Sequence, residues 1–186
     1  STRTYFTEEI TVTGTKGVQF ITAHDHHLIA AGVTDNENTV YYSVNNDPTS
    51  FSGTGAGAVT ISDKIVGIKG FRTDLFIFCE NRIFKLSGTS SANFAVTPVT
   101  RNIGCVNGDT IQEFAGDLIF LGPDGLRTIA GTARIGDVEL GTISSNVQSL
   151  FRENLNDSGS FTSLVIPDKT QYRIFFSKAG GAQKAT

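Results

Sequence analysis

The stretch that decides the fold covers residues 75–86 and reads Leu-Phe-Ile-Phe-Cys-Glu-Asn-Arg-Ile-Phe-Lys-Leu. Two apolar runs are separated by a short polar segment, the pattern of two antiparallel strands joined by a turn. Phe and Ile also suit pleated, half-buried strands. The same plan of apolar run, polar turn and apolar run occurs four times along the chain, over residues 28–43, 75–86, 118–129 and 164–176.

The spacing of these hairpins is nearly constant. They begin at Leu28, Leu75, Leu118 and Leu164, which are 47, 43 and 46 residues apart. A period in the forties with β-hairpins inside each unit is typical of propeller blades, whereas stacked helix pairs of similar length would show helical periodicity. The sequence therefore predicts an all-β fold of repeated antiparallel hairpins, forming a β-propeller or part of one.

We expect one β domain over residues 1–178, followed by a flexible tail or linker at 179–186 that begins with Ala-Gly-Gly-Ala. A further strand precedes three of the hairpins, so each unit has three strands or four. The predicted units span residues 18–53, 65–88, 110–131 and 161–178.

One segment breaks the β pattern. Apolar residues at positions 143, 147, 150, 151 and 155 repeat with helical spacing, and Ser144 or Ser145 could cap the first turn. We expect a short amphipathic helix near residues 144–155, packed on the rim or side of a blade.

Bulk composition narrows the functional classes. The 186 residues carry a formal net charge of −3 and have no Lys/Arg run, which argues against nucleic-acid binding. No apolar run approaches the roughly 20 residues that span a bilayer, so we expect no membrane partner. Two cysteines do not make a disulfide framework, and Cys79 and Cys105 are expected to be free thiols.

All three histidines lie in the segment His24-Asp25-His26-His27. On a strand, His24 and His26 would point to one face, and such a pair could hold a metal such as Zn²⁺ with a third ligand from elsewhere. A polar strand start or loop with solvated imidazoles is the alternative that we favour, and no metal site is assigned.

Several carboxylates invite a catalytic interpretation. Asp74, Asp117, Asp137 and Glu139 could converge on a pocket, as the carboxylates of glycosidases do. Asp124 lies in Pro-Asp-Gly between two apolar strands, which is a turn signal instead. Because no nucleophile elbow and no His-Glu-x-x-His motif occurs, we expect no enzyme, no catalytic residue and no cofactor.

Four arginines lie near predicted strand ends or turns, where each is expected to form a weak surface ion pair. They are Arg72, Arg101, Arg127 and Arg134. Pairing with carboxylates of another unit or of a neighbouring subunit is the alternative.

Several stretches resemble tailed-bacteriophage virion proteins of the tail tubular (nozzle) type, over about residues 18–176. They are residues 40–43 with 46–51, residues 75–88, and residues 103–105 with 116–127. The resemblance implies a virion structural protein, assembled in the host cytoplasm, that contacts other tail proteins and sister subunits of a homo-oligomer. It offers no catalytic residues to carry over. A carbohydrate-binding or carbohydrate-cleaving propeller and a metal-binding β domain using His24 and His26 remain the alternatives.

Overall fold

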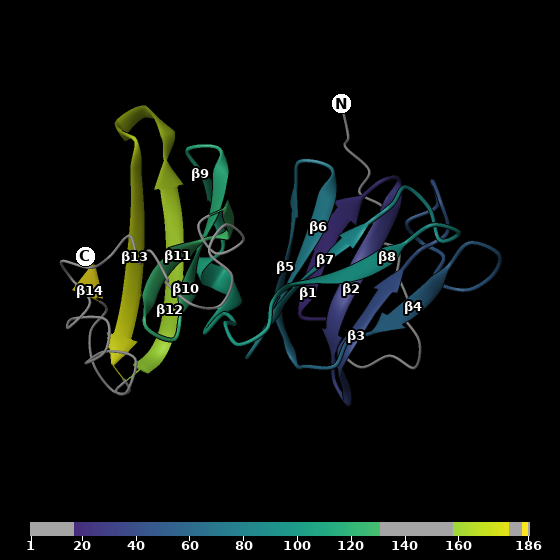
Figure 1. Cartoon of the computed structure of the whole chain (residues 1–186), viewed down its shortest axis with the longest axis horizontal. Helices are drawn as coiled ribbons and strands as arrows, with labels where there is room; N and C mark the ends of the chain where they lie inside the picture. Colours follow the sequence, from purple (N-terminus) through teal and green to yellow (C-terminus); the bar gives the residue numbers. More distant parts are fainter. Residues whose placement is uncertain (1–16, 131–157, 179–183, 186) are drawn as a thin grey trace, which may run out of the picture.

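The computed structural model describes residues 17–130, 158–178 and 184–185. These residues form four antiparallel sheets, numbered 1 to 4 along the chain, with sheets 1 and 2 on the right of Figure 1 and sheets 3 and 4 on the left. Sheet 1 contains β1 (Phe20–His24), β2 (His27–Val33), β3 (Asn36–Tyr42) and β4 (Gly57–Thr60). Sheet 2 contains β5 (Ile65–Phe71), β6 (Asp74–Cys79), β7 (Ile83–Ser87) and β8 (Ala95–Thr100).

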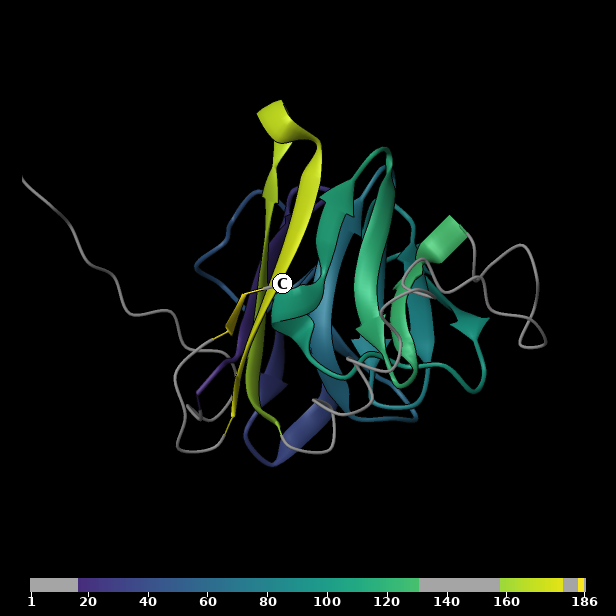
Figure 2. The ribbon, with the colours of Figure 1, turned by 90° about the vertical axis from the view of Figure 1, so that its left-hand side faces the viewer.

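The other two sheets are shorter. Sheet 3 contains β9 (Gln112–Phe114), β10 (Asp117–Gly122) and β11 (Gly125–Thr128), preceded by the 3₁₀ helix η1 (Gly108–Thr110). Sheet 4 contains β12 (Ser158–Ile166), β13 (Gln171–Lys178) and β14 (Lys184–Ala185), with the 3₁₀ helix η4 (Pro167–Lys169) between β12 and β13. In the turned view of Figure 2, the yellow β12–β13 hairpin again lies beside sheet 3.

Within each sheet, the strands lie side by side in their order along the chain. This up-and-down arrangement, repeated from sheet to sheet, is the topology of propeller blades. The predicted all-β, partial-propeller fold of repeated antiparallel hairpins is therefore confirmed.

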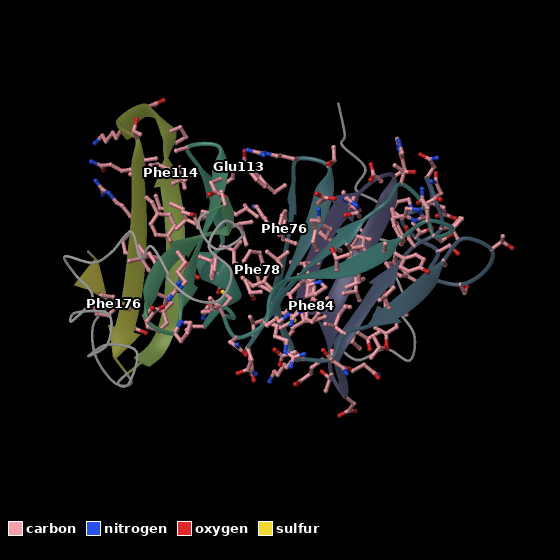
Figure 3. The ribbon with its side chains drawn as sticks, in the orientation of Figure 1. Phe76, Phe78, Phe84, Glu113, Phe114 and Phe176 are labelled. Carbon is pink, nitrogen blue, oxygen red and sulfur yellow. The ribbon has the colours of Figure 1, made fainter. Side chains whose placement is uncertain are left out.

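The sheets pack face to face. We call the face of a sheet that points to the preceding sheet its rear face, and the opposite one its front face. The rear face of sheet 2 presents Leu75 and Ile77 to sheet 1, and its front face presents Phe76 and Phe78 to sheet 3. Figure 3 shows Phe76 and Phe78 on the side of sheet 2 toward β9. Because both faces of sheet 2 are covered, the sequence of β6 is a continuous apolar run and does not alternate between apolar and polar residues.

The first two predicted units, 18–53 and 65–88, are too short at their C-terminal ends. Sheets 1 and 2 each gain a fourth strand, β4 and β8, so they extend to Thr60 and Thr100. Both are edge strands with several exposed residues, and β8 contains Pro98, which only an edge strand tolerates readily. Weak apolar patterning and a proline concealed these strands in the sequence.

Leu164 is not equivalent to the other three hairpin leucines. Leu75 and Leu118 are fully buried on the second strand of their sheets, whereas Leu164 lies on the first strand of sheet 4 and is 41% exposed. The pairing of Ser163 with the buried Ile174 places these residues on the rear face, so Leu164 points forward, away from sheet 3. The spacing of 46 residues thus does not mark a true repeat position.

The helix expected near residues 144–155 lies outside the described residues, as does most of the expected tail at 179–186. Two residues of that tail, Lys184–Ala185, form the short strand β14, which pairs with Phe175 and Phe176 of β13. In the part of the chain that the structure describes, no helix has the length and apolar character needed to span a bilayer.

Candidate functional site

Equivalent two-residue turns join the first two strands of sheets 1, 2 and 3. They consist of Asp25-His26, Arg72-Thr73 and Ala115-Gly116, and each has a residue with positive φ. Positive φ at the turn matches the right-handed twist of the flanking strands, which favours tight hairpins. The turn of sheet 2 lies between two grooves, and Phe71, Arg72 and Thr73 line both of them.

The first groove, between sheets 2 and 3, has a volume of about 640 Å³. Phe71 and Phe76 supply apolar lining, and Lys85 supplies a positive charge. The second groove, between sheets 1 and 2, has a volume of about 500 Å³. Its lining includes Lys69 of β5, and Glu113 of β9 in sheet 3 also reaches it. The second groove therefore lies beside β1, β5 and β9, which are the first strands of sheets 1, 2 and 3.

Arg72 separates the two grooves and links sheet 2 to sheet 3. Its Nη2 donates a hydrogen bond to the carbonyl oxygen of Gly116, 3.2 Å away in the next turn. The guanidinium also stacks 5.0 Å from the centre of the Phe71 ring. Arg72 therefore forms the contact across units that was the alternative prediction, with a backbone carbonyl in place of a carboxylate.

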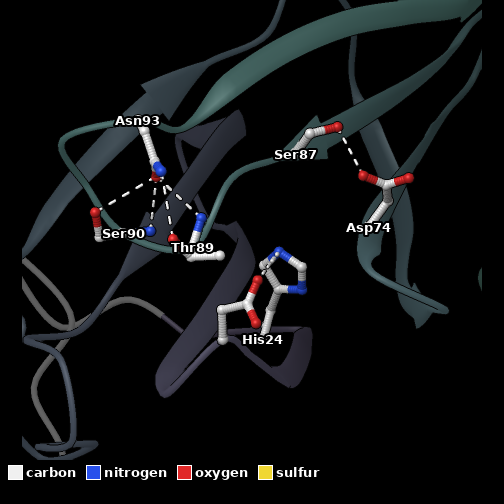
Figure 4. A network of polar contacts seen from close by, with 7 residues as sticks. His24, Asp74, Ser87, Thr89, Ser90 and Asn93 are labelled. Atoms are coloured by element: carbon white, nitrogen blue, oxygen red, sulfur yellow. Dashed lines mark hydrogen bonds and ion pairs between the residues drawn. The ribbon is translucent and has the colours of Figure 1, made fainter.

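Asp74 and Asp117 both line the first groove, as the carbohydrate hypothesis requires. Asp74 accepts a hydrogen bond from the Ser87 hydroxyl (2.7 Å) and lies 3.3 Å from the Lys85 ammonium, as Figure 4 shows for Ser87. Asp117 accepts from the backbone N–H groups of Leu118 (2.8 Å) and Ala130 (3.1 Å).

These contacts repeat. Asp74 and Asp117 each open the second strand of a sheet, and each accepts a bond from a residue thirteen positions later, where the following strand has ended or is ending. In sheet 1 the equivalent first residue is His27, whose Nδ1–H donates to the carbonyl of Ser43 (2.6 Å). Each polar side chain thus ties the start of one strand to the end of its hairpin. The two carboxylates therefore each hold together the strands of their own sheet.

Asp137 and Glu139, the other two candidates of the carbohydrate hypothesis, lie outside the described residues.

The histidine segment forms a turn and not a continuous strand. Asp25 and His26 are the turn residues, with φ of 41° and 64°, and His26 is exposed. His24 is buried instead and pairs across the hairpin with His27. The expectation that His24 and His26 share one face is therefore wrong, because the turn separates them.

The metal hypothesis gains no further ligand from the structure. His24 Nε2 lies 3.4 Å from a carboxylate oxygen of Asp25. Over residues 17–130 and 158–178, no three His, Cys, Asp or Glu side chains are grouped closely enough to hold a metal ion.

The buried histidines belong to an aromatic cluster that joins sheets 1 and 2. The His27 ring lies 5.3 Å from that of Phe94 and 5.9 Å from that of Tyr42, both edge-on. Phe94 precedes β8, in a loop that Asn93 holds by accepting hydrogen bonds from the N–H groups of Thr89 and Ser90 (Figure 4). This loop has no periodic pattern of apolar residues, so its role in packing was not predicted.

Arg127 is the largest correction among the predicted surface residues. Its side chain is 2% exposed and forms a two-point contact with Asp124, the turn residue of the β10–β11 hairpin. The turn interpretation of Asp124 is confirmed, with Pro123 and Asp124 in the turn and Gly125 at φ 139°. A carboxylate in this turn is what allows a buried arginine on the adjoining strand.

Both cysteines are free, as expected, and both are buried. Loss of hydration raises the pKa of the Cys79 thiol to about 12, and burial raises the pKa of Cys105 to about 12 as well. Neutral thiols in the core are poor nucleophiles, so these residues have a packing role.

Comparison with known protein families found no match for this chain, and comparison with curated proteins found none either. Among solved structures, the chain is similar to the N-terminal domain of Nup159, with 11% sequence identity and a TM-score of 0.43. The alignment covers 95% of this chain and 44% of the Nup159 chain, so this chain spans less than half of that structure.

Proposed function

We propose that the chain is a structural component of a phage tail, located in the virion, that works by contacting sister subunits and other tail proteins. The sequence resemblance over about residues 18–176 supports this assignment. The observation that carries it is that charged side chains near the blade ends bond to other parts of their own hairpins. Asp74, Asp117 and Arg127 are each engaged in holding strands or hairpins together.

This use of charge suits a scaffold. A catalytic site needs groups whose protonation state can change or whose bonds can be exchanged for bonds to a substrate. Here the polar side chains of the first groove stabilise the hairpins themselves, and the thiols are buried. The exposed surfaces of the sheets are then available for contacts with other proteins.

Mass spectrometry of purified virions tests the proposal. We expect peptides of this chain in tail-containing particles, at a level comparable to that of other tail proteins. Immunogold labelling should place the chain on the tail. Its absence from purified particles that contain all other tail proteins would contradict the proposal.

A carbohydrate-binding function is the second candidate, because Phe71 and Phe76 give the first groove an apolar wall beside Lys85 and Arg72. A glycan array combined with a hydrolysis assay tests it. Binding that Lys85→Ala abolishes, and that the second-groove variant Lys69→Ala leaves intact, would favour this candidate. A chain that is present in the virion and silent in both assays would favour the scaffold.

A further inference from the structure

The repeat places an apolar triplet on the rear face of each of the first three sheets. In sheet 2, Leu75 and Ile77 are fully buried against sheet 1, and Ile68 packs beside them. The second and third residues of this triplet follow the first at the same intervals as in the corresponding triplets of sheets 1 and 3. The triplets are Ile21, Leu28 and Ala30; Ile68, Leu75 and Ile77; and Ile111, Leu118 and Phe120.

The triplet of sheet 3 behaves as that of sheet 2 does. Leu118 and Phe120 are fully buried and Ile111 nearly so, in one cluster with Phe78 and Ile83 from the front face of sheet 2. The rear face therefore packs on the preceding sheet in sheet 2 and again in sheet 3.

Sheet 1 has the same rear face and no described sheet behind it. Ile21 is 63% exposed, although it occupies the position of Ile68 and pairs with Ala30 as Ile68 pairs with Ile77. Phe51 covers the part of this face that β2 and β3 form, where it packs in one cluster with Ala30 and Tyr41, and Ala30 is 1% exposed. Ala23 of β1 is exposed like Ile21, so the part of the face that β1 forms is an open apolar surface.

The other end of the stack has an open front face. The rear face of sheet 4 packs Phe161 and Phe176 against sheet 3. The pairing of Thr162 with Phe175 and of Leu164 with Arg173 puts these residues on the front face. Leu164 is 41% exposed there, and Phe175 is half-buried. Figure 1 shows sheets 1 and 4 at opposite ends of the molecule, so the chain does not cover either face with the other.

We propose that a second copy of this chain covers both open faces, with the front face of sheet 4 in one copy packed on the rear face of sheet 1 in the other. This contact continues the front-to-rear packing that already joins the sheets of one chain. Two copies together hold eight described sheets, and propellers close with roughly four to eight blades. A head-to-tail contact of this kind can close into a ring.

This inference rests on the proposed function, because it names the surface by which the chain would contact a sister subunit. The two can fail separately, since finding the chain in virions does not depend on its association in solution.

Analytical ultracentrifugation and light scattering on the purified 186-residue protein test the inference. The wild type is expected to be a dimer. Ile21→Asp and Leu164→Asp each place an unpaired charge in the interface, and each should weaken dimerisation on the order of a hundredfold. Val106→Asp is the matched control, because Val106 is 41% exposed and belongs to neither sheet 1 nor sheet 4, so it should leave the dimer intact. Circular dichroism confirms that the variants are folded.

A mixture of the two variants gives the sharper readout. Ile21→Asp retains the sheet 4 face and Leu164→Asp retains the sheet 1 face, so together they can form one intact contact and should dimerise better than either alone. A wild type that stays monomeric at about 100 μM would overturn the inference. So would dimers that survive Leu164→Asp but not Ile21→Asp, open-ended polymers, or loss of the dimer in the Val106→Asp control.

Discussion

At the scale of single residues, Arg127 shows how one turn residue permits a buried charge. The guanidinium is 2% exposed, whereas Asp124 is 30% exposed and keeps part of its hydration. We expect Asp124→Ala to lower the free energy of unfolding by about 2–4 kcal/mol, because it leaves a buried cation without its carboxylate. Arg127→Met should cost less, since an apolar side chain of similar length suits the site and Asp124 can be hydrated. Urea denaturation measures both.

A double-mutant cycle provides the control for this pair. In the Arg127→Met background, Asp124→Ala should be nearly neutral, because the cation that needed it is gone. If Asp124→Ala costs the same in both backgrounds, the carboxylate acts through the turn alone and the ion-pair explanation is wrong.

At the scale of elements, neighbouring sheets are positioned by close backbone contacts as well as by apolar side chains. Gly108 of η1 lies so near β5 that a Cβ would overlap the carbonyl oxygen of Val66. Because both partners are backbone, neither can move aside without displacing a strand. Gly108→Ala should therefore destabilise the protein by about 1–3 kcal/mol in a thermal or urea unfolding experiment.

Gly17→Ala is the matched control for that substitution, since nothing lies within 4 Å of its Cβ position. It should change the free energy of unfolding by less than about 0.5 kcal/mol. Equal effects of the two substitutions would show that η1 does not approach β5 so closely.

The elements also show which parts of the fold were readable in the sequence. Strands such as β6 are buried on both faces, so a continuous apolar run identified them directly. The edge strands β4 and β8 need little apolar content, and local patterning did not reveal them. A strand start or loop was predicted at residues 24–27, but not the two-residue turn at Asp25-His26. Such a turn with positive φ is usually marked by Gly or Asn, whereas here Asp and His fill it. The roles of Asp74 and Asp117 depend on hydrogen bonds across a hairpin, which the residue types alone do not specify.

At the scale of the whole molecule, two buried thiols and a buried tyrosine hydroxyl predict how the free energy of unfolding depends on pH. Burial raises the pKa of both thiols and of the Tyr172 hydroxyl to about 12, against 9.0 and 10.0 without burial. The folded protein thus retains protons that the unfolded chain releases, so their contribution to stability is complete below about pH 9 and is lost as pH rises toward 12. We expect the urea midpoint to fall between about pH 9 and pH 12. The double variant Cys79→Ala/Cys105→Ala should be less stable than the wild type at neutral pH, because the smaller side chains leave cavities. It should nevertheless lose less stability than the wild type over the alkaline range. Parallel decline of the two proteins would mean that thiol ionisation is not the cause.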